Sequence, residues 1–271
     1  MISNKFKFDE YLYAETIANE GFRSVNKKPE LKMLAKYYRD VWRLTEPQVR
    51  KKLIEFCQKH VLDFDIAIHF KLINTAISSS KKGSALICVP WICIYKNEVN
   101  EIANIPLTHS HKKLFFTLVV YDRLIRKSIK MKTGTEPNVV YYRGGKRNYA
   151  KLKGFANLKK DFDINKDGIP ELAKLGFVKI LDRGGIEIKP FPENPEQSEV
   201  MINVKDYDNI GLYYDCAAGN KKIKMCVHCN KPFYQKSNRQ KYCKPCAAED
   251  EKDKKSWFSA ITYRFKKEKR A

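Results

Sequence analysis

Residues 226–246 have the sequence CVHCNKPFYQKSNRQKYCKPC, and this stretch decides the fold of the C-terminal part of the chain. It contains two Cys-x-x-Cys pairs, Cys226 with Cys229 and Cys243 with Cys246. Two such pairs joined by a short spacer bring four sulfur atoms within tetrahedral reach, which is the arrangement that a structural zinc ion requires. The spacing therefore predicts a closed site for Zn²⁺. A redox pair, an iron-sulfur centre or unconnected thiols are the alternatives.

The residues around these cysteines predict a treble clef, which is a knuckle followed by a hairpin and a helix. Residues 230–234 suit a knuckle that turns into a short hairpin. Cys246 then opens a helix in which Trp257, Ile261 and Phe265 lie four residues apart. We expect a small aromatic core around the metal, formed by Phe233, Tyr234, Tyr242 and Trp257.

The charge of the chain is the outlier of its composition. Its 271 residues include 53 Lys and Arg against 31 Asp and Glu, which gives a net charge of +22. Residues 216–271 hold 16 basic and 5 acidic side chains, and residues 112–160 hold 14 basic and 2 acidic ones. A surplus of this size indicates a polyanionic partner first, through counterion release at phosphates, and an acidic protein or membrane surface second.

Residues 1–83 predict a helical N-terminal region. Thr45 and Gln48 form a capping box at the start of one of its helices. The run 78–83, with the sequence SSSKKG, is typical of a linker and closes the region. Apolar residues recur at helical spacing and are expected to form a core, at Leu31, Leu34, Tyr38, Val41, Trp42, Val49, Leu53 and Phe56.

Residues 84–215 predict a separate central domain. We expect, in order, a buried strand, a short helix, a long helix, a basic loop, two helical stretches and a β-hairpin, at residues 85–95, 97–104, 109–127, 128–143, 149–157, 158–175 and 177–189. A strand, three helices and a hairpin are typical of a winged helix-turn-helix domain, whose recognition helix enters the major groove. With the zinc module at 216–271, the expected fold class is α+β.

Basic side chains cluster where the predicted winged helix would meet a nucleic acid. Those of the central domain are Lys146, Arg147, Lys151, Lys153, Lys159 and Lys160, and those of the zinc module are Lys236, Arg239, Lys254 and Lys255. Such residues mainly contact phosphate and do not by themselves identify a base sequence. The alternative is a solvated basic face, part of which balances the −2 charge of a zinc ion held by four thiolates.

Other candidate motifs carry no chemistry in our interpretation. Residues 163–168, DINKDG, match the first half of a calcium-binding loop, but Lys174 stands where that loop needs a bidentate Glu. His109 and His111 have no carboxylate or Cys close in sequence and are expected to begin a helix. His228 is expected to point away from the metal, because four sulfurs complete its shell. Phosphate-loop, nucleophile-elbow and dinucleotide motifs are missing, so we expect no enzymatic activity.

The remaining cysteines indicate a reducing compartment. Cys57, Cys88, Cys93 and Cys216 stand singly among apolar or helical neighbours, which is typical of buried, reduced thiols. The longest apolar run, residues 85–95, is too short to span a bilayer, and no leader segment opens the chain. We therefore expect a soluble cytoplasmic protein.

Four segments carry a resemblance to known proteins. They are residues 94–102 (IYKNEVNEI), 113–121 (KLFFTLVVY), 171–177 (ELAKLGF) and the cysteine module 226–246. Their order resembles a group of proteins of phages and mobile elements of Gram-positive bacteria, over most of residues 31–250. The resemblance implies a helical N-terminus, a winged-helix-like centre, a C-terminal zinc knuckle and a role associated with nucleic acids.

These patterns predict a non-enzymatic protein that binds nucleic acid. Duplex DNA is the expected partner, and a regulator or accessory factor of a phage or mobile element is the expected role. The alternative is a protein-directed inhibitor or adaptor that occupies the nucleic-acid groove of a host polymerase or defence nuclease. RNA binding is a third hypothesis, because Phe233, Tyr234 and Tyr242 could stack on bases, although the zinc core also needs these rings.

Overall fold

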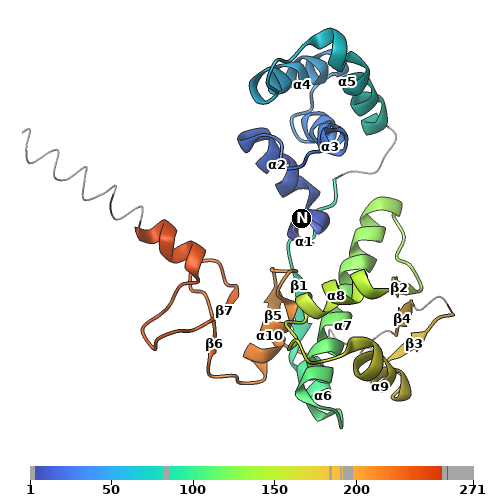
Figure 1. The fold of residues 1–271 in the computed structure, drawn as a ribbon, viewed down its shortest axis with the longest axis vertical. Helices are drawn as coiled ribbons and strands as arrows, with labels where there is room; N and C mark the ends of the chain where they lie inside the picture. Colours follow the sequence, from blue (N-terminus) through green and yellow to red (C-terminus); the bar gives the residue numbers. More distant parts are fainter. Residues whose placement is uncertain are drawn as a thin grey trace, which may run out of the picture.

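The computed structural model describes residues 4–81, 86–182, 185–189, 191, 198–251 and 255. It is an α+β structure, as the sequence predicts, with helices at the N-terminus and small antiparallel sheets in the remainder. Three hydrophobic clusters lie in the N-terminal helices, in the central body and around four cysteines. In Figure 1 the N-terminal helices (blue) lie at one end of the molecule, and the cysteine module (orange to red) lies beside the central body.

The N-terminal helices enclose a core of their own. Leu31, Leu34 and Leu53 are fully buried in it. Gln48 accepts a hydrogen bond at 2.8 Å from the backbone N–H of Thr45, as the predicted capping box requires. The helices are α1 Asn4–Phe8, α2 Glu10–Glu20, α3 Lys27–Asp40, α4 Glu46–His60 and α5 Ile66–Lys81.

Trp42 departs from the predicted core of this region. Helix α3 ends at Asp40, two residues before the tryptophan, so Trp42 is no longer on the helical face that buries Leu34. Its side chain is 46% exposed and packs against the rings of Tyr37 and Tyr38, at centroid distances of 6.0 and 5.0 Å. The prediction of a core position for Trp42 is wrong because the apolar periodicity continues beyond the end of the helix.

The N-terminus is anchored to the central body through backbone pairing. The N–H of Glu10 donates to the carbonyl of Ile87 at 2.7 Å, and the N–H of Val89 donates to the carbonyl of Phe8 at 2.9 Å. Phe8 is buried in the central core, where its ring packs edge-on against Tyr121. Helices α1 and α2 therefore lie against the central body as well as against α3.

The central body is built around α7. Its core includes residues from several faces of this helix, as expected for a helix in the middle of a core: Leu114, Phe115, Phe116, Leu118, Val119 and Leu124. The elements of the body are β1 Ile92–Tyr95, α6 Lys96–Asn104, α7 His109–Thr133, β2 Val140–Tyr142, α8 Lys146–Phe155, the π-helical turn η1 Ile164–Gly168, α9 Ile169–Lys174, β3 Val178–Ile180, β4 Ile186–Ile188, β5 Val200–Val204 and α10 Ile210–Ala217. After α10 come β6 Ile223–Met225, β7 Pro232–Tyr234 and a helix at 244–251.

The β-hairpin predicted at 177–189 is confirmed, and it belongs to a larger sheet. Strand β3 pairs antiparallel with β4, with Lys179 opposite Glu187. Opposite charges at facing positions stabilise such a pair. Strand β2 pairs with the other edge of β4, with Val140 opposite Ile188, so the sheet has the order β2-β4-β3.

The basic loop predicted at 128–143 is shorter than expected, because its two ends belong to helix α7, which runs to Thr133, and to strand β2, Val140–Tyr142. Helix α7 continues up to Gly134, whose φ of +81° ends it in the left-handed region. Val140 and Tyr142 are then buried on one face of β2, with Tyr141 exposed on the other. An alternation of three residues is too short to be distinguished from a loop by pattern alone.

The strand predicted at 85–95 is shorter than expected, and it lies outside the sheet that contains the hairpin. Only its last four residues form β1, which pairs antiparallel with β5, with Ile92 opposite Val204. The strand that completes the hairpin sheet is β2, which lies between α7 and α8. The helices and strands around this sheet therefore follow the order α7, β2, α8, η1 with α9, β3 and β4.

Candidate metal centre

The four predicted metal ligands lie together. The ligand sulfurs of Cys226, Cys229, Cys243 and Cys246 all lie within 4.8 Å of one another. The two sulfurs of Cys229 and Cys243 are 3.7 Å apart. A tetrahedral shell with metal–sulfur bonds of about 2.3 Å separates its sulfurs by about 3.8 Å. The cysteines are therefore positioned to hold one metal ion.

Local backbone geometry brings the two cysteine pairs together. Cys226 directly follows β6, and the chain turns back at Asn230, which has a left-handed φ of +55°. The N–H of Asn230 donates to the carbonyl of Cys226 at 2.9 Å, which closes the turn. Cys243 directly precedes the helix at 244–251, and Cys246 lies in its first turn. The predicted knuckle and helix are present, but the hairpin differs from the prediction: β6 and β7 enclose the knuckle, and within the described residues no second hairpin follows it.

Backbone donors surround the sulfur of Cys226. The N–H of Cys243 donates to it at 3.4 Å. Burial alone would raise the pKa of Cys226, but hydrogen bonds from the backbone of Cys229, Cys243 and His228 lower this pKa to about 6. The pKa of Cys246 is raised, chiefly by its hydrogen bond with the sulfur of Cys243. Cys226 therefore offers a thiolate near neutral pH, and the thiolate is the form that binds a metal ion.

The aromatic core around the cysteines is smaller than predicted. Phe233 is buried, and Tyr242 packs against the cysteine cluster. Tyr234 remains 57% exposed, because successive side chains of β7 point to opposite faces, so its predicted core position is wrong. Trp257 lies outside the described residues. His228 is exposed and is not one of the four clustered ligands.

An ion-pair network around the buried carboxylate of Asp215 joins α7 to α10, the helix that leads into the cysteine module. Oδ1 of Asp215 lies 2.7 Å from Nε2 of His109, and its Oδ2 accepts a hydrogen bond from Nζ of Lys113. Lys113 also donates to the carbonyl of Asn157 at 3.1 Å. The sequence shows no carboxylate near His109, because Asp215 is 106 residues away and only the packing of α10 on α7 brings it close.

The remaining motifs have structural roles. Helix α7 begins at His109, as predicted, and Nε2 of His111 lies 3.1 Å from the carbonyl oxygen of Asp167. In the calcium-loop-like stretch, the carboxylate of Asp163 accepts from the N–H of Asn165 at 2.8 Å and caps η1. Within the described part of the chain, the cysteine cluster is the one group of three or more side chains arranged to hold a metal ion.

The basic residues predicted on the central body do not form a single surface. Lys146 and Arg147 are exposed in the first turn of α8, and Lys159 and Lys160 are exposed in the loop that follows this helix. These four cations are free to meet solvent or a ligand. We call them the α8 cations.

Lys153 and Lys151 are placed differently from the α8 cations. Nζ of Lys153 donates to the backbone oxygens of Lys160 and Phe162, both at 2.6 Å, so its ammonium is engaged within the protein. Lys151 is half-buried and lines a cleft on another side of α8. The sequence could not separate these two lysines, because both lie in the same basic helix.

The cysteine module displays two of its predicted cations on an ordered loop. Lys236 and Arg239 are exposed between β7 and the second cysteine pair. Oε1 of Gln240 accepts from the N–H of Lys236 at 2.8 Å and closes this loop. Lys255 is exposed after the helix at 244–251, and Lys254 lies outside the described residues.

Comparison with family models, with curated proteins and with solved structures found no match. Within residues that the structure describes, no helix is both long enough and apolar enough to cross a membrane. The features that bear on function are the cysteine cluster, the basic surfaces and the topology of the central body.

Proposed function

We propose that this protein binds double-stranded DNA through a winged helix-turn-helix unit and catalyses no reaction. The observation that carries the proposal is the order α7, β2, α8, η1 with α9, β3 and β4, together with the sheet order β2-β4-β3. Helices and strands follow one another in this way in winged-helix domains. In that arrangement the β3–β4 hairpin is the wing, and η1 with α9 takes the recognition position.

The segment in the recognition position is not basic. Asp163 and Asp167 lie at η1, and in α9 Glu171 pairs with Lys174 at 2.5 Å. Carboxylates repel the phosphate backbone, so this segment is poorly suited to lie deep in a groove. We propose that the α8 cations make the main duplex contacts. Such contacts fix the position of a protein on the backbone and carry little base information.

We further propose that the metal ion is Zn²⁺ and that the module is a treble clef. Four thiolate ligands in tetrahedral geometry suit zinc, and a closed shell leaves no position for a reactant. Lys236 and Arg239 lie on the loop between the ligand pairs, so the metal would hold two cations in fixed positions. These cations would add phosphate contacts to those of the central body.

The biological role that fits is that of a regulator or accessory factor of a phage or mobile element, acting in the host cytoplasm. Its support is the resemblance of the four segments to proteins of such elements. A protein that contacts backbone rather than bases suits an accessory role at a site that other factors select.

Salt dependence of duplex binding tests the proposal. We expect affinity for a short labelled duplex, measured by fluorescence anisotropy, to fall by roughly 0.9 log units per log unit of salt for each phosphate contacted. Alanine at all four α8 cations should remove up to four such contacts and reduce the slope by about three to four units. The affinity should fall by a similar factor for unrelated duplex sequences.

A matched control carries the same loss of charge at a distance from α8. Lys28, Lys32, Lys51 and Lys59 are exposed on the N-terminal helices, and their joint replacement by alanine should leave the slope nearly unchanged. If the slope of log affinity against log salt falls equally in the α8 variant and in this control, the salt effect comes from net charge alone. Absence of salt-sensitive binding to any duplex would refute the proposed function.

Exposed apolar side chains favour a second candidate function, a protein-directed inhibitor or adaptor. Leu62, Ile66, Ile68 and Phe70 are between 48% and 90% exposed, and they lie just before α5 or in its first turns. Exposed apolar side chains gathered in one segment are typical of a protein contact. The cationic surfaces would then occupy the nucleic-acid groove of a host polymerase or nuclease.

Co-purification after nuclease treatment distinguishes this candidate. The inhibitor or adaptor function predicts that a host polymerase or nuclease stays bound in stoichiometric amount to the full-length chain. That partner should be lost from Ile68→Lys and Phe70→Lys and kept by Lys59→Ala. A partner that nuclease treatment releases would instead be tethered by nucleic acid, as duplex binding requires.

A further inference from the structure

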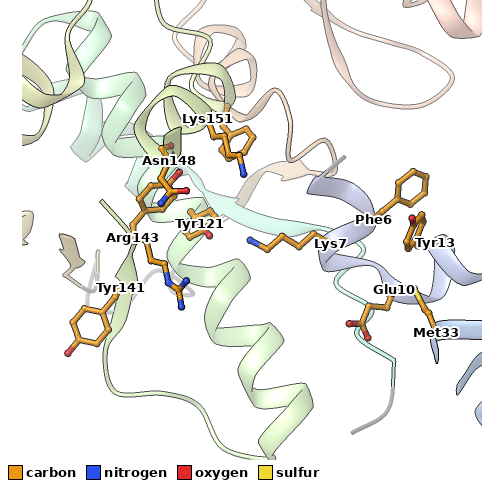
Figure 2. A pocket seen from close by; sticks show the side chains of 12 residues that line it. Phe6, Lys7, Glu10, Tyr13, Met33, Tyr121, Tyr141, Arg143, Asn148 and Lys151 are labelled. Carbon is orange, nitrogen blue, oxygen red and sulfur yellow. Dashed lines mark hydrogen bonds between the residues drawn. The ribbon is translucent and has the colours of Figure 1, made fainter. Parts of the chain in front are cut away.

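A cleft of about 630 Å³ separates the N-terminal helices from the central body. One wall is formed by α1 and α2, and the other by β2, α8 and the middle of α7. Figure 2 shows Lys7 extending from α1 toward Tyr121, with Arg143 and Lys151 coming from the opposite wall. The volume is that of a site for one small molecule or one residue of a polymer.

Three cations converge on this cleft from different parts of the chain. Lys7, Arg143 and Lys151 line it, and within the described residues none of them forms an ion pair with a carboxylate. Glu10 also lines the cleft, but its carboxylate accepts from the N–H of Ile87 at 3.1 Å. Three cations against this one carboxylate leave the cleft with a net positive charge.

The cations are close enough to repel one another. Desolvation lowers the pKa of Lys7, and the positive charges of Lys151 and Lys132 lower it further. Like charges that are brought together without a counter-charge cost free energy, and a bound anion removes that cost. The ammonium of Lys7 lies 5.8 Å from the centroid of the Tyr121 ring, on the floor of the cleft. The charge pattern thus indicates an anionic ligand.

An exposed aromatic ring adjoins the cations. Tyr141 and Arg143 are two residues apart on β2 and its continuation, so both project from the exposed face of the strand. Tyr141 is 55% exposed at the rim of the cleft. An arginine and an exposed aromatic ring on the same face of a strand suit a ligand that joins a phosphate to a planar ring.

We propose that the cleft binds one nucleotide of an unpaired nucleic-acid strand, with its phosphate between Lys7, Arg143 and Lys151 and its base stacked on Tyr141. The inference rests on the proposed function and extends it from duplex to unpaired strand. A duplex keeps its base faces inside the stack, so only an unpaired nucleotide can offer a face to Tyr141. Lys132 does not line the cleft but adds a fourth positive charge close enough to act on Lys7, and this wider positive charge suits a strand rather than a free nucleotide.

The proposal is tested by comparing how single-stranded DNA, duplex DNA and a mononucleotide bind the full-length, zinc-loaded chain. Affinities for an oligothymidylate, a blunt duplex and thymidine monophosphate are measured by anisotropy and competition at one salt concentration. The variant Lys7→Ala with Arg143→Ala is expected to lower the ratio of single-strand to duplex affinity about tenfold, for two lost phosphate contacts. Tyr141→Ala should lower that ratio by about fivefold to a hundredfold, the range for one stacked base, and Tyr141→Phe should preserve it.

Controls separate the cleft from general charge and from misfolding. Lys28→Ala with Lys32→Ala removes two exposed cations elsewhere and should leave the ratio unchanged. Tyr234→Ala removes another exposed tyrosine and should also leave it unchanged. The circular dichroism melting curve of Tyr141→Ala should match that of the parent chain, because the replaced ring is largely exposed.

The outcomes assign failure to one proposal or the other. If the chain binds duplex and the cleft variants leave the ratio of single-strand to duplex affinity unchanged, only the cleft proposal is overturned. Loss of both affinities by the same factor also overturns it, because the cleft would then be part of a general basic surface. If thymidine monophosphate competes as well as the oligothymidylate does, per nucleotide, the proposal that the ligand is a strand is refuted. Absence of binding to any nucleic acid refutes both the cleft and the proposed function.

Discussion

Replacement of Cys226 by serine is expected to release the metal ion and to unfold residues 223–251, while α7 and the β2-β4-β3 sheet stay folded. The described core of the module holds only Phe233 and Tyr242 besides the cysteines, which is too little apolar surface to fold by burial alone. Structural zinc contributes roughly 10–16 kcal/mol in small zinc peptides, and that binding free energy is folding free energy. Hydrogen exchange of residues 223–251 should rise to the rate of an unfolded peptide.

A cysteine outside the cluster provides the control. Cys88 is exposed, so its predicted burial is wrong, and it is not one of the four clustered ligands. Cys88→Ser should therefore keep one bound metal ion per chain, measured by atomic emission. Stoichiometric metal in Cys226→Ser would show that the four sulfurs are not a single site. Loss of exchange protection in α7 would show that the central body depends on the module.

The Arg123→Ala variant is expected to lose about 3–5 kcal/mol of stability in the central body, because it leaves a buried carboxylate without its counter-charge. Glu98 is fully buried, and the guanidinium of Arg123 donates to both of its oxygens, one of them at 2.9 Å. The same guanidinium donates to the carbonyl of Cys93 at 2.8 Å, so it joins α7 to α6 and β1. Urea unfolding and hydrogen exchange of α6 should both report the loss.

An exposed ion pair gives the matched comparison. Lys174 and Glu171 pair at 2.5 Å, with 70% and 38% of their side chains exposed, so Lys174→Ala should change stability by about 1 kcal/mol or less. A joint change of Glu98 and Arg123 to methionine should recover much of the loss, since it removes both buried charges. A loss below about 1 kcal/mol for Arg123→Ala would mean that water reaches Glu98.

The metal ligands and the hairpin could be predicted because their information is local. The Cys-x-x-Cys spacing brings two sulfurs together within one turn, and the alternation of Val178 to Ile180 against Ile186 to Ile188 specifies a hairpin around a short turn. The argument against a calcium site at residues 163–168 was also local, because it rested on Lys174 at the position that needs a bidentate Glu, and Asp163 caps η1 in the structure.

The surface residues could not be assigned in the same way. Lys151 and Lys153 are two positions apart in one helix, yet one lines a cleft and the other donates to the backbone of residues 160 and 162. Their spacing turns the two side chains roughly 200° apart around the helix, and only packing decides what each of them meets. Arg143 belonged to a segment predicted as a loop, so its place across the cleft from Lys7 could not be foreseen.

The sequence by itself determined the α+β class, the four clustered cysteines and the basic character of the chain. Each of these follows from spacing within a few residues or from composition. The tertiary structure alone decided the partner strand of the hairpin, the contact of Asp215 with His109 and the cleft between Lys7 and Arg143. Two of these contacts join residues more than a hundred positions apart. The third pairs the hairpin with β2, a strand of only three residues. Their free energy comes from burying whole helices and strands together, and no local pattern in the chain records it.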